Sequence, residues 1–192
     1  MSDTSELDRV ILDNLQNLDD AAKRIEELGD SVWSEICESM EGWASKNAWE
    51  GDYNLDDPWL TPAEWFRDEE PDAYFYVEKG PKGTAAPPTY WLSHCIGVGH
   101  GQLCLWLEQK VTGPKQWKAL ARSYASRFAE KGFSLSDSGN FYTSCSLNAK
   151  DVAAALEGQR LETAMTPIEE ALDRAASATV LFNQILAEAR TK

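Results

Sequence analysis

Two apolar runs joined by a glycine-rich turn, at residues 90–110, constrain the fold of this chain more than any other stretch. The runs meet at three alternating glycines, Gly97, Gly99 and Gly101. Because side chains alternate between the two faces of a strand, and glycine suits tight turns, the pattern predicts a central β-hairpin. A turn centred on residues 99–100 would place Cys95 opposite Cys104, and a turn centred on residues 100–101 would change those partners. The sequence leaves this register open.

Amphipathic helices are predicted at both ends of the chain. Apolar residues recur at three- and four-residue spacing over residues 5–28, and Gly29 is expected to end this helix. A second helix should then reach about residue 48. Near the C-terminus, Thr166-Pro-Ile-Glu169 has the form of a capping box and predicts the start of a long helix. These terminal helices have apolar seams that fit either packing on each other or a homodimer, and the sequence leaves both open.

The middle of the chain carries the signals of further strands and helices. Residues 73–79 alternate in polarity and predict a first strand, a helix is expected from Pro114 to Gly132, and residues 133–147 contain a second hairpin. Asn148 is expected to cap the short helix that follows. The sequence therefore predicts a single α+β domain, in which helices flank a mostly antiparallel sheet built around the hairpin at 90–110.

The charge of the chain limits its partners. With 192 residues, 43% of them hydrophobic, and a formal net charge of −14, the chain can build one core under an acidic surface. Acidity disfavours direct binding to nucleic acid or to an anionic membrane, and it favours a basic protein partner. The N-terminus lacks the apolar segment of a signal peptide, and the four cysteines fit reduced thiols. We therefore expect a cytoplasmic location.

Residues 49–72 form an acidic, aromatic segment that is the main candidate binding surface. Its carboxylates are accompanied by a single basic residue, Arg67, and by several large rings. Carboxylates spaced among exposed rings can imitate the phosphates and bases of nucleic acid, which a basic protein groove would recognise. Within the segment, Thr61-Pro-Ala-Glu64 has the form of another capping box and predicts a short helix. The candidate binding residues are Trp49, Asp52, Tyr53, Asp56, Asp57, Trp59, Trp65, Asp68, Glu69 and Glu70.

Both histidines of the chain lie in the same short stretch as two cysteines. Histidine and cysteine are zinc-ligand types, but His94 and Cys95 are neighbours on the predicted strand and would point to opposite faces. A zinc site would need Cys95, His100 and Cys104 to converge with a fourth ligand such as Cys145. We expect core thiols and a turn histidine here, and no metal or other cofactor.

The segment Pro71-Asp72 lies upstream of Glu108-Gln-Lys110, which closes an apolar strand. Together with the predicted order of helix, three strands, helix and strand over residues 31–147, these residues resemble the core of the PD-(D/E)xK nucleases, over about half of the chain. The resemblance implies that Asp72 and Glu108 hold Mg²⁺ and that Lys110 positions the attacking water or stabilises the developing charge. The family's aspartate lies on the strand before the Glu-x-Lys strand, and here that strand has no acidic residue.

These observations lead to one principal expectation. The chain would be a non-enzymatic binding protein, acting as an inhibitor, an immunity protein or an assembly subunit, and it would engage a basic partner such as a nucleic-acid-binding protein. The alternative is a Mg²⁺-dependent PD-(D/E)xK-like nuclease, or its inactive descendant, that uses Asp72, Glu108 and Lys110. Whether the protein is an enzyme stays open, and its acidic composition favours the binding role.

Overall fold

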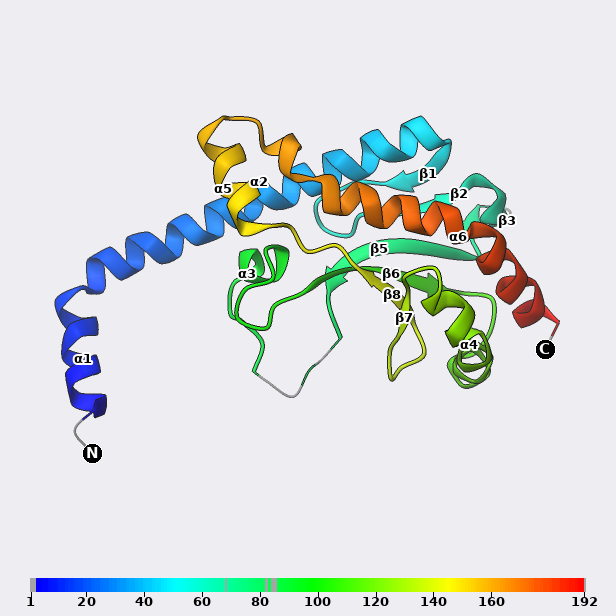
Figure 1. The fold of residues 1–192 in the computed structure, drawn as a ribbon, viewed down its shortest axis with the longest axis horizontal. Coiled ribbons are helices and arrows are strands. Elements are labelled where there is room, and N and C mark those ends of the chain that lie inside the picture. The colour runs from blue at the N-terminus through cyan, green and yellow to red at the C-terminus, as the bar shows by residue number, and fades with distance from the viewer. Residues whose placement is uncertain (1–2, 68, 82, 84–85, 192) are drawn as a thin grey trace.

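The computed structural model describes residues 3–67, 69–81, 83 and 86–191 of the chain (Figure 1). Its helices are α1 (Asp3–Asp13), α2 (Leu15–Asn47), α3 (Trp91–Cys95), α4 (Pro114–Ala129), α5 (Ala149–Glu157) and α6 (Thr166–Arg190), with 3-10 turns η1 (Ala63–Trp65) and η2 (Leu161–Ala164). Its strands are β1 (Trp49–Asp52), β2 (Trp59–Pro62), β3 (Phe66–Arg67), β4 (Glu70–Pro71), β5 (Ala73–Lys79), β6 (Leu103–Gln109), β7 (Ser134–Leu135) and β8 (Phe141–Ser144).

Six of these strands form one antiparallel sheet in the order β1-β2-β5-β6-β8-β7. The short strands β3 and β4 pair with each other beside it. With long helices at both ends of the chain, the predicted α+β class is confirmed. None of the helices in the described part of the chain combines the length and the apolar character that a membrane span requires.

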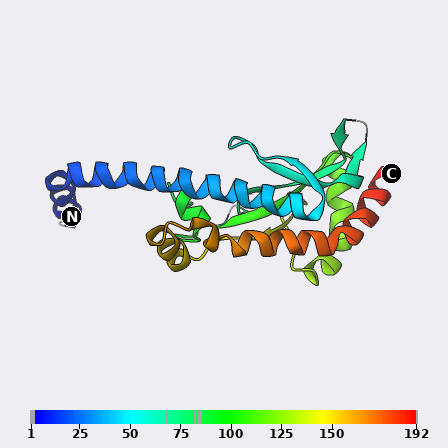
Figure 2. The ribbon, with the colours of Figure 1, turned by 90° about the horizontal axis from the view of Figure 1, so that it is seen from above.

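Helices α2 and α6 run side by side along one face of the sheet (Figures 1 and 2). Phe182 of α6 is the centre of the core: its ring centroid lies 5.3 Å from that of Phe75 on β5 and 4.4 Å from that of Phe128 on α4. Trp43 of α2 reaches across to α6, where its indole nitrogen donates a hydrogen bond of 2.8 Å to Asp173. The same face of the sheet therefore packs against three helices.

Helix α2 is a single helix of 33 residues, so the predicted end at Gly29 is wrong. A Cβ atom built on Gly29 would lie 3.7 Å from the Cβ atom of Leu92, which shows that the glycine lies where α3 packs against α2. The apolar stripe keeps its phase across Gly29, and the helix continues with it. The break comes earlier, at Asn14, where α1 turns away from α2 (Figures 1 and 2).

The predicted hairpin at residues 90–110 is also wrong. Its first half is the short helix α3, and only its second half is a strand, β6, whose partners are β5 and β8. Cys104 accordingly lies opposite Glu78 and Ser144, and not opposite Cys95. The glycine-rich loop folds back on α3, because the backbone nitrogen of Val98 donates to the carbonyl oxygen of Ser93 at 2.9 Å.

The acidic segment contains more regular structure than the sequence indicates. Residues 49–52 and 59–62 pair as β1 and β2, with Trp49 opposite Pro62 and Asp52 opposite Trp59. The predicted short helix is only the 3-10 turn η1, and the hydroxyl of Thr61 does not cap it but donates to the carbonyl oxygen of Ala73 at 2.7 Å. Strand β1 is at the edge of the sheet, where charged residues such as Glu50 are tolerated.

Several predicted elements are confirmed. Strand β5, helix α4 and the β7–β8 hairpin lie where the sequence places them. Asn148 caps α5, because its side-chain oxygen accepts a hydrogen bond of 2.8 Å from the backbone nitrogen of Lys150. Helix α6 begins at Thr166 as expected, but Met165 occupies the cap position and makes no side-chain hydrogen bond there, so the predicted capping box is absent.

Candidate binding cleft

A cleft of about 310 Å³ opens between α2, α3, the β1–β2 loop and the edge of β5. It is lined by Trp33, Leu55, Asp56, Asp57, Pro58, Tyr76, Val77, Glu78 and Trp91. The lining therefore combines aromatic rings with three carboxylates, and it includes two of the predicted binding residues, Asp56 and Asp57.

Two tryptophans build one wall of the cleft. The rings of Trp33 and Trp91 meet edge to face with centroids 5.2 Å apart. The indole nitrogen of Trp33 donates a hydrogen bond of 2.8 Å to the carbonyl oxygen of Leu55, which ties the β1–β2 loop to α2. The ammonium group of Lys79 lies 5.3 Å from the centroid of the Trp91 ring, so one ring of this wall already contacts a cation.

The β1–β2 loop presents its carboxylates through side-chain turns. The side-chain oxygen of Asn54 accepts hydrogen bonds of 3.0 Å from the backbone nitrogens of both Asp56 and Asp57. Asp52 in turn accepts a hydrogen bond of 3.1 Å from the backbone nitrogen of Asn54. Asn and Asp favour turns because their side chains can bond to the backbone two residues later. The loop thus holds two adjacent exposed carboxylates at the rim of the cleft.

One edge of β5 faces the cleft. Just outside the two ends of β5, the backbone nitrogen of Lys110 donates to the carbonyl oxygen of Asp72, and that of Gly80 donates to the carbonyl oxygen of Gln102, both at 2.8 Å. The backbone groups of even-numbered residues along β5 therefore point toward β6, because this direction alternates along a strand. The backbone groups of Val77 therefore point the other way, toward β2. Strand β2 pairs with β5 only as far as Tyr76, and the next residue beside Val77 is Pro58, which has no N–H group to donate.

The charges around Tyr76 make this region strongly negative. Burial is the main reason that the pKa of Tyr76 rises to about 12, and the nearby charges of Glu108, Glu78 and Asp57 raise it further. Burial also raises the pKa of Glu108 above its ordinary range. Three carboxylates from different segments thus surround one phenol, an arrangement that favours a cation.

The structure places the three tryptophans of the predicted set outside the cleft. Trp65 is buried in the core, with its ring centroid 5.7 Å from that of Phe75, and Trp49 is half-buried against the core, 5.1 Å from Trp43. Trp59 is half-buried and contacts Tyr74, with centroids 5.9 Å apart. These tryptophans therefore fix the segment to the sheet.

The remaining members of the predicted set that the structure describes lie outside the cleft lining. Tyr53 is half-buried, and burial, followed by the charge of Glu41, raises its pKa to about 12. Glu69 is exposed, and Glu70 forms an ion pair of 3.0 Å with Lys110. Asp68 lies outside the described residues. Asp56 and Asp57 are thus the part of the predicted surface that reaches the cleft.

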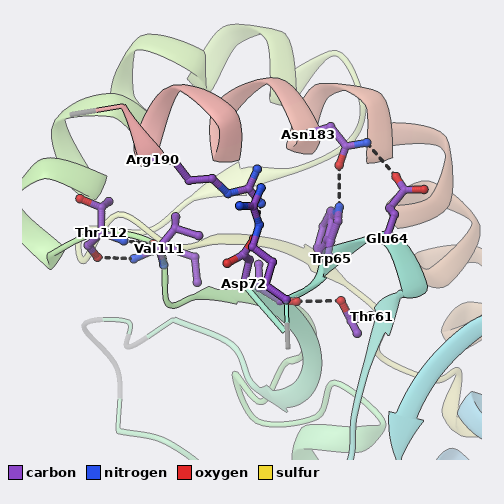
Figure 3. A network of polar contacts seen from close by, with 11 residues as sticks. Thr61, Glu64, Trp65, Asp72, Val111, Thr112, Asn183 and Arg190 are labelled. Atoms are coloured by element: carbon purple, nitrogen blue, oxygen red, sulfur yellow. Dashed lines mark hydrogen bonds and ion pairs between the residues drawn. The ribbon is translucent and has the colours of Figure 1, made fainter. Parts of the chain in front are cut away.

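The residues of the nuclease-like pattern have partners within the chain. Asp72 binds the guanidinium groups of Arg190 and, at 2.9 Å, Arg67 (Figure 3). Glu108 accepts a hydrogen bond of 3.2 Å from the side chain of Asn140. A metal ion at Asp72 would have to replace two arginines, and the nuclease hypothesis stays a prediction.

The cysteine and histidine residues do not assemble a metal site within the described part of the chain, where no group of three or more His, Cys, Asp or Glu side chains could hold an ion. Cys95, Cys104 and Cys145 are all buried and reduced. His100 is exposed in the glycine-rich loop, with a positive φ of 67°, whereas His94 is buried on α3. The three cysteines are therefore core thiols and His100 is a turn histidine, as the sequence predicts.

The cleft residues that sequence reasoning missed are Trp33, Leu55, Pro58, Tyr76, Val77, Glu78 and Trp91. Trp33 lies on the apolar stripe of α2, where a core position is the usual interpretation, while Tyr76 and Glu78 alternate on β5 as in any strand. The available signal was local: a turn of Asp, Asn and Asp residues immediately before Pro58. Comparison of the chain with protein-family models, curated proteins and solved structures found no match.

Proposed function

We propose that this protein is a non-enzymatic binding protein whose cleft receives a basic, extended segment of a partner protein. One observation carries the proposal: a single cleft brings the carboxylates of Asp56, Asp57 and Glu78 together with the rings of Trp33 and Trp91. A lysine or arginine side chain can pack its apolar stem on aromatic rings and place its cationic end on carboxylates. The lining would therefore select a segment that carries lysine or arginine.

The rest of the molecule supports the same choice of partner. The net charge of −14 steers basic surfaces toward the protein and repels nucleic acid. The loop with Asp56 and Asp57 is pinned to α2 through Trp33, so part of the cleft is ordered before a partner arrives. Inhibitor, immunity protein and assembly subunit are all roles that such a cleft would serve.

The test uses a fluorescein-labelled nonapeptide of alternating lysine and threonine, with fluorescence anisotropy as the measurement. We expect binding that weakens as salt rises and that falls about tenfold in the double variant Asp56→Asn/Asp57→Asn. The matched control is Glu169→Gln/Glu170→Gln, which removes the same charge from exposed positions on α6, outside the cleft. The control should keep its affinity within about twofold.

A further peptide tests the sign of the charge. The same nonapeptide with glutamate in place of lysine should not bind, because its carboxylates would be repelled by those of the cleft. Equal loss of affinity in the cleft variant and the control variant would overturn the proposal, since net charge alone would then explain binding. Failure of the lysine peptide to bind would overturn it as well.

A further inference from the structure

The N-terminal part of the molecule is a helical arm, residues 5–28, that extends beyond the sheet and its covering helices (Figures 1 and 2). The buried residues of α2 begin at Gly29. Toward the N-terminus, Leu15 and Leu18 are 56% and 48% exposed, and Leu7 and Leu12 of α1 are 58% and 71% exposed. The arm therefore presents a row of large apolar side chains to solvent.

The exposed row continues a seam that is buried elsewhere on the same helix. Apolar and small residues alternate at spacings of three and four along α2: Leu15, Leu18, Ala22, Ile25, Gly29, Val32 and Ile36. From Gly29 onward this seam packs against the rest of the molecule, and Val32 and Ile36 are fully buried. The spacing is the heptad pattern of helices that pack against other helices. The arm therefore has the apolar spacing of a helix that packs against another helix, but Leu15 and Leu18 are exposed and Ala22 and Ile25 are only half-buried.

The arm also depends on few interactions of its own. The joint between α1 and α2 is held by local hydrogen bonds, in which the backbone nitrogen of Asn14 donates to the carbonyl oxygens of Val10 and Ile11 at 3.2 Å. Helix α1 has only 11 residues, and a helix this short is marginally stable in water when it packs on nothing. A contiguous exposed apolar surface on a helix marks an interaction site. A partner helix would stabilise the arm by covering the seam.

The charges of the arm decide what kind of helix fits. Residues 5–28 contain seven acidic side chains and three basic ones. With Leu15 at heptad position a and Leu18 at d, the flanking e positions are Asp19 and Glu26. A second copy packed antiparallel would bring these carboxylates together. A second copy packed parallel would bring the two bodies to the same end, where each body already occupies the seam from Gly29 onward.

We propose that the arm is the docking site for a basic amphipathic helix of another protein, which places leucine-like residues on the Leu15–Ile25 seam and lysine or arginine beside Asp19 and Glu26. This surface is separate from the cleft, because the two share no lining residue. Failure of either proposal therefore leaves the other standing.

The probe is a synthetic 28-residue helical peptide with leucine at positions a and d and lysine at e and g, and isothermal titration calorimetry measures its binding to the full chain. The comparison peptide has glutamate at e and g. We expect the lysine peptide to bind at least about tenfold more tightly than the glutamate peptide. The double variant Leu15→Ser/Leu18→Ser should lose at least about tenfold in affinity for the lysine peptide.

Two control variants make the result specific. Val180→Ser changes a side chain that is 70% exposed on α6, outside the arm, and should bind the lysine peptide like the wild type. Glu169→Gln/Glu170→Gln removes two exposed carboxylates outside both sites and should also bind it normally, which separates the arm from the overall charge of the chain. Circular dichroism and urea midpoints show whether each variant is folded.

Three results would overturn the proposal. Equal affinity for both peptides would mean that the seam binds any apolar helix, and no affinity for either would mean that it binds none. Dimerisation in sedimentation velocity that disappears in Leu15→Ser/Leu18→Ser would identify a second copy of this chain as the occupant.

Discussion

The indole nitrogen of Trp65 donates a hydrogen bond of 2.6 Å to the side-chain oxygen of Asn183, which lies on α6, the last helix of the fold (Figure 3). The amide group of Asn183 then donates to Glu64 at 2.8 Å. One side chain of α6 thus satisfies a buried indole and holds the turn η1 in place. The acidic segment is fixed to the core at this point.

Replacing Asn183 with leucine should lower the free energy of unfolding by about 1–3 kcal/mol, because the buried N–H group of Trp65 loses its acceptor. Urea denaturation measures the change. In the double variant with Trp65→Phe, the loss of stability should be smaller than the sum of the losses in the two single variants, since the second substitution removes the unsatisfied donor. Strictly additive losses would show that the two side chains are not coupled.

Replacing Gly29 with alanine should raise the free energy of unfolding by about 0.5–1 kcal/mol. The residue lies inside a continuous helix, where glycine is less favourable than alanine, and the added Cβ atom would make an ordinary contact with Leu92 at 3.7 Å. The measurement is again the urea midpoint, with Gly29→Leu as a comparison that should destabilise by crowding Leu92. A loss of stability in Gly29→Ala would show that α3 packs too closely on α2 to accept a Cβ atom at this position.

Glu108 should make stability depend on pH in an unusual direction for a carboxyl group. Burial raises its pKa in the folded protein above the ordinary value of 4.5, so the folded state binds the proton more tightly than the unfolded state does. The charged form therefore destabilises the fold above the raised pKa, and this effect disappears as the pH falls below 4.5. Glu108→Gln should be more stable than the wild type at pH 7 and equally stable at pH 4. A Gln variant that is less stable at pH 7 would contradict this.

The four cysteines should be unreactive in the native protein. Burial raises the pKa of Cys37 to about 11 and those of Cys95 and Cys104 to about 12, and it raises that of Cys145 as well. At pH 8 the thiols are therefore protonated as well as buried, and only the thiolate reacts quickly. Ellman's reagent should label them slowly in buffer and completely in urea. A single thiol that reacts at once in buffer would reveal an activated cysteine.

Local patterns predicted those parts of the fold that depend on local chemistry. Strand β5 alternates because one face is buried, and Asn148 bonds to the backbone of the helix it begins, so both could be identified without the rest of the chain. Gly29 misled the prediction because glycine has two uses, to end a helix or to let another element approach it. Only the position of Leu92 distinguishes them.

The cleft could not be predicted in the same way, because its lining comes from four segments. Trp33 and Trp91 meet only when α3 packs on α2, and Val77 faces the cleft only because Pro58 ends the pairing of β2. The three- and four-residue spacing of apolar residues along α2 does not show which part of the helix surface the rest of the molecule leaves uncovered. The sequence predicted the acidity of the site and two of its carboxylates, and long-range packing supplied the rest.

The position of α6 has a consequence for how the chain is made. Phe75 and Phe141 lie on strands that are synthesised before residue 166, yet both contact Phe182 of α6. A ribosome that has completed the sheet therefore carries a nascent chain whose apolar strand face lacks one of its three covering helices. The core closes only after α6 has emerged, so folding follows the synthesis of the sheet, and a chaperone would find its substrate in that interval.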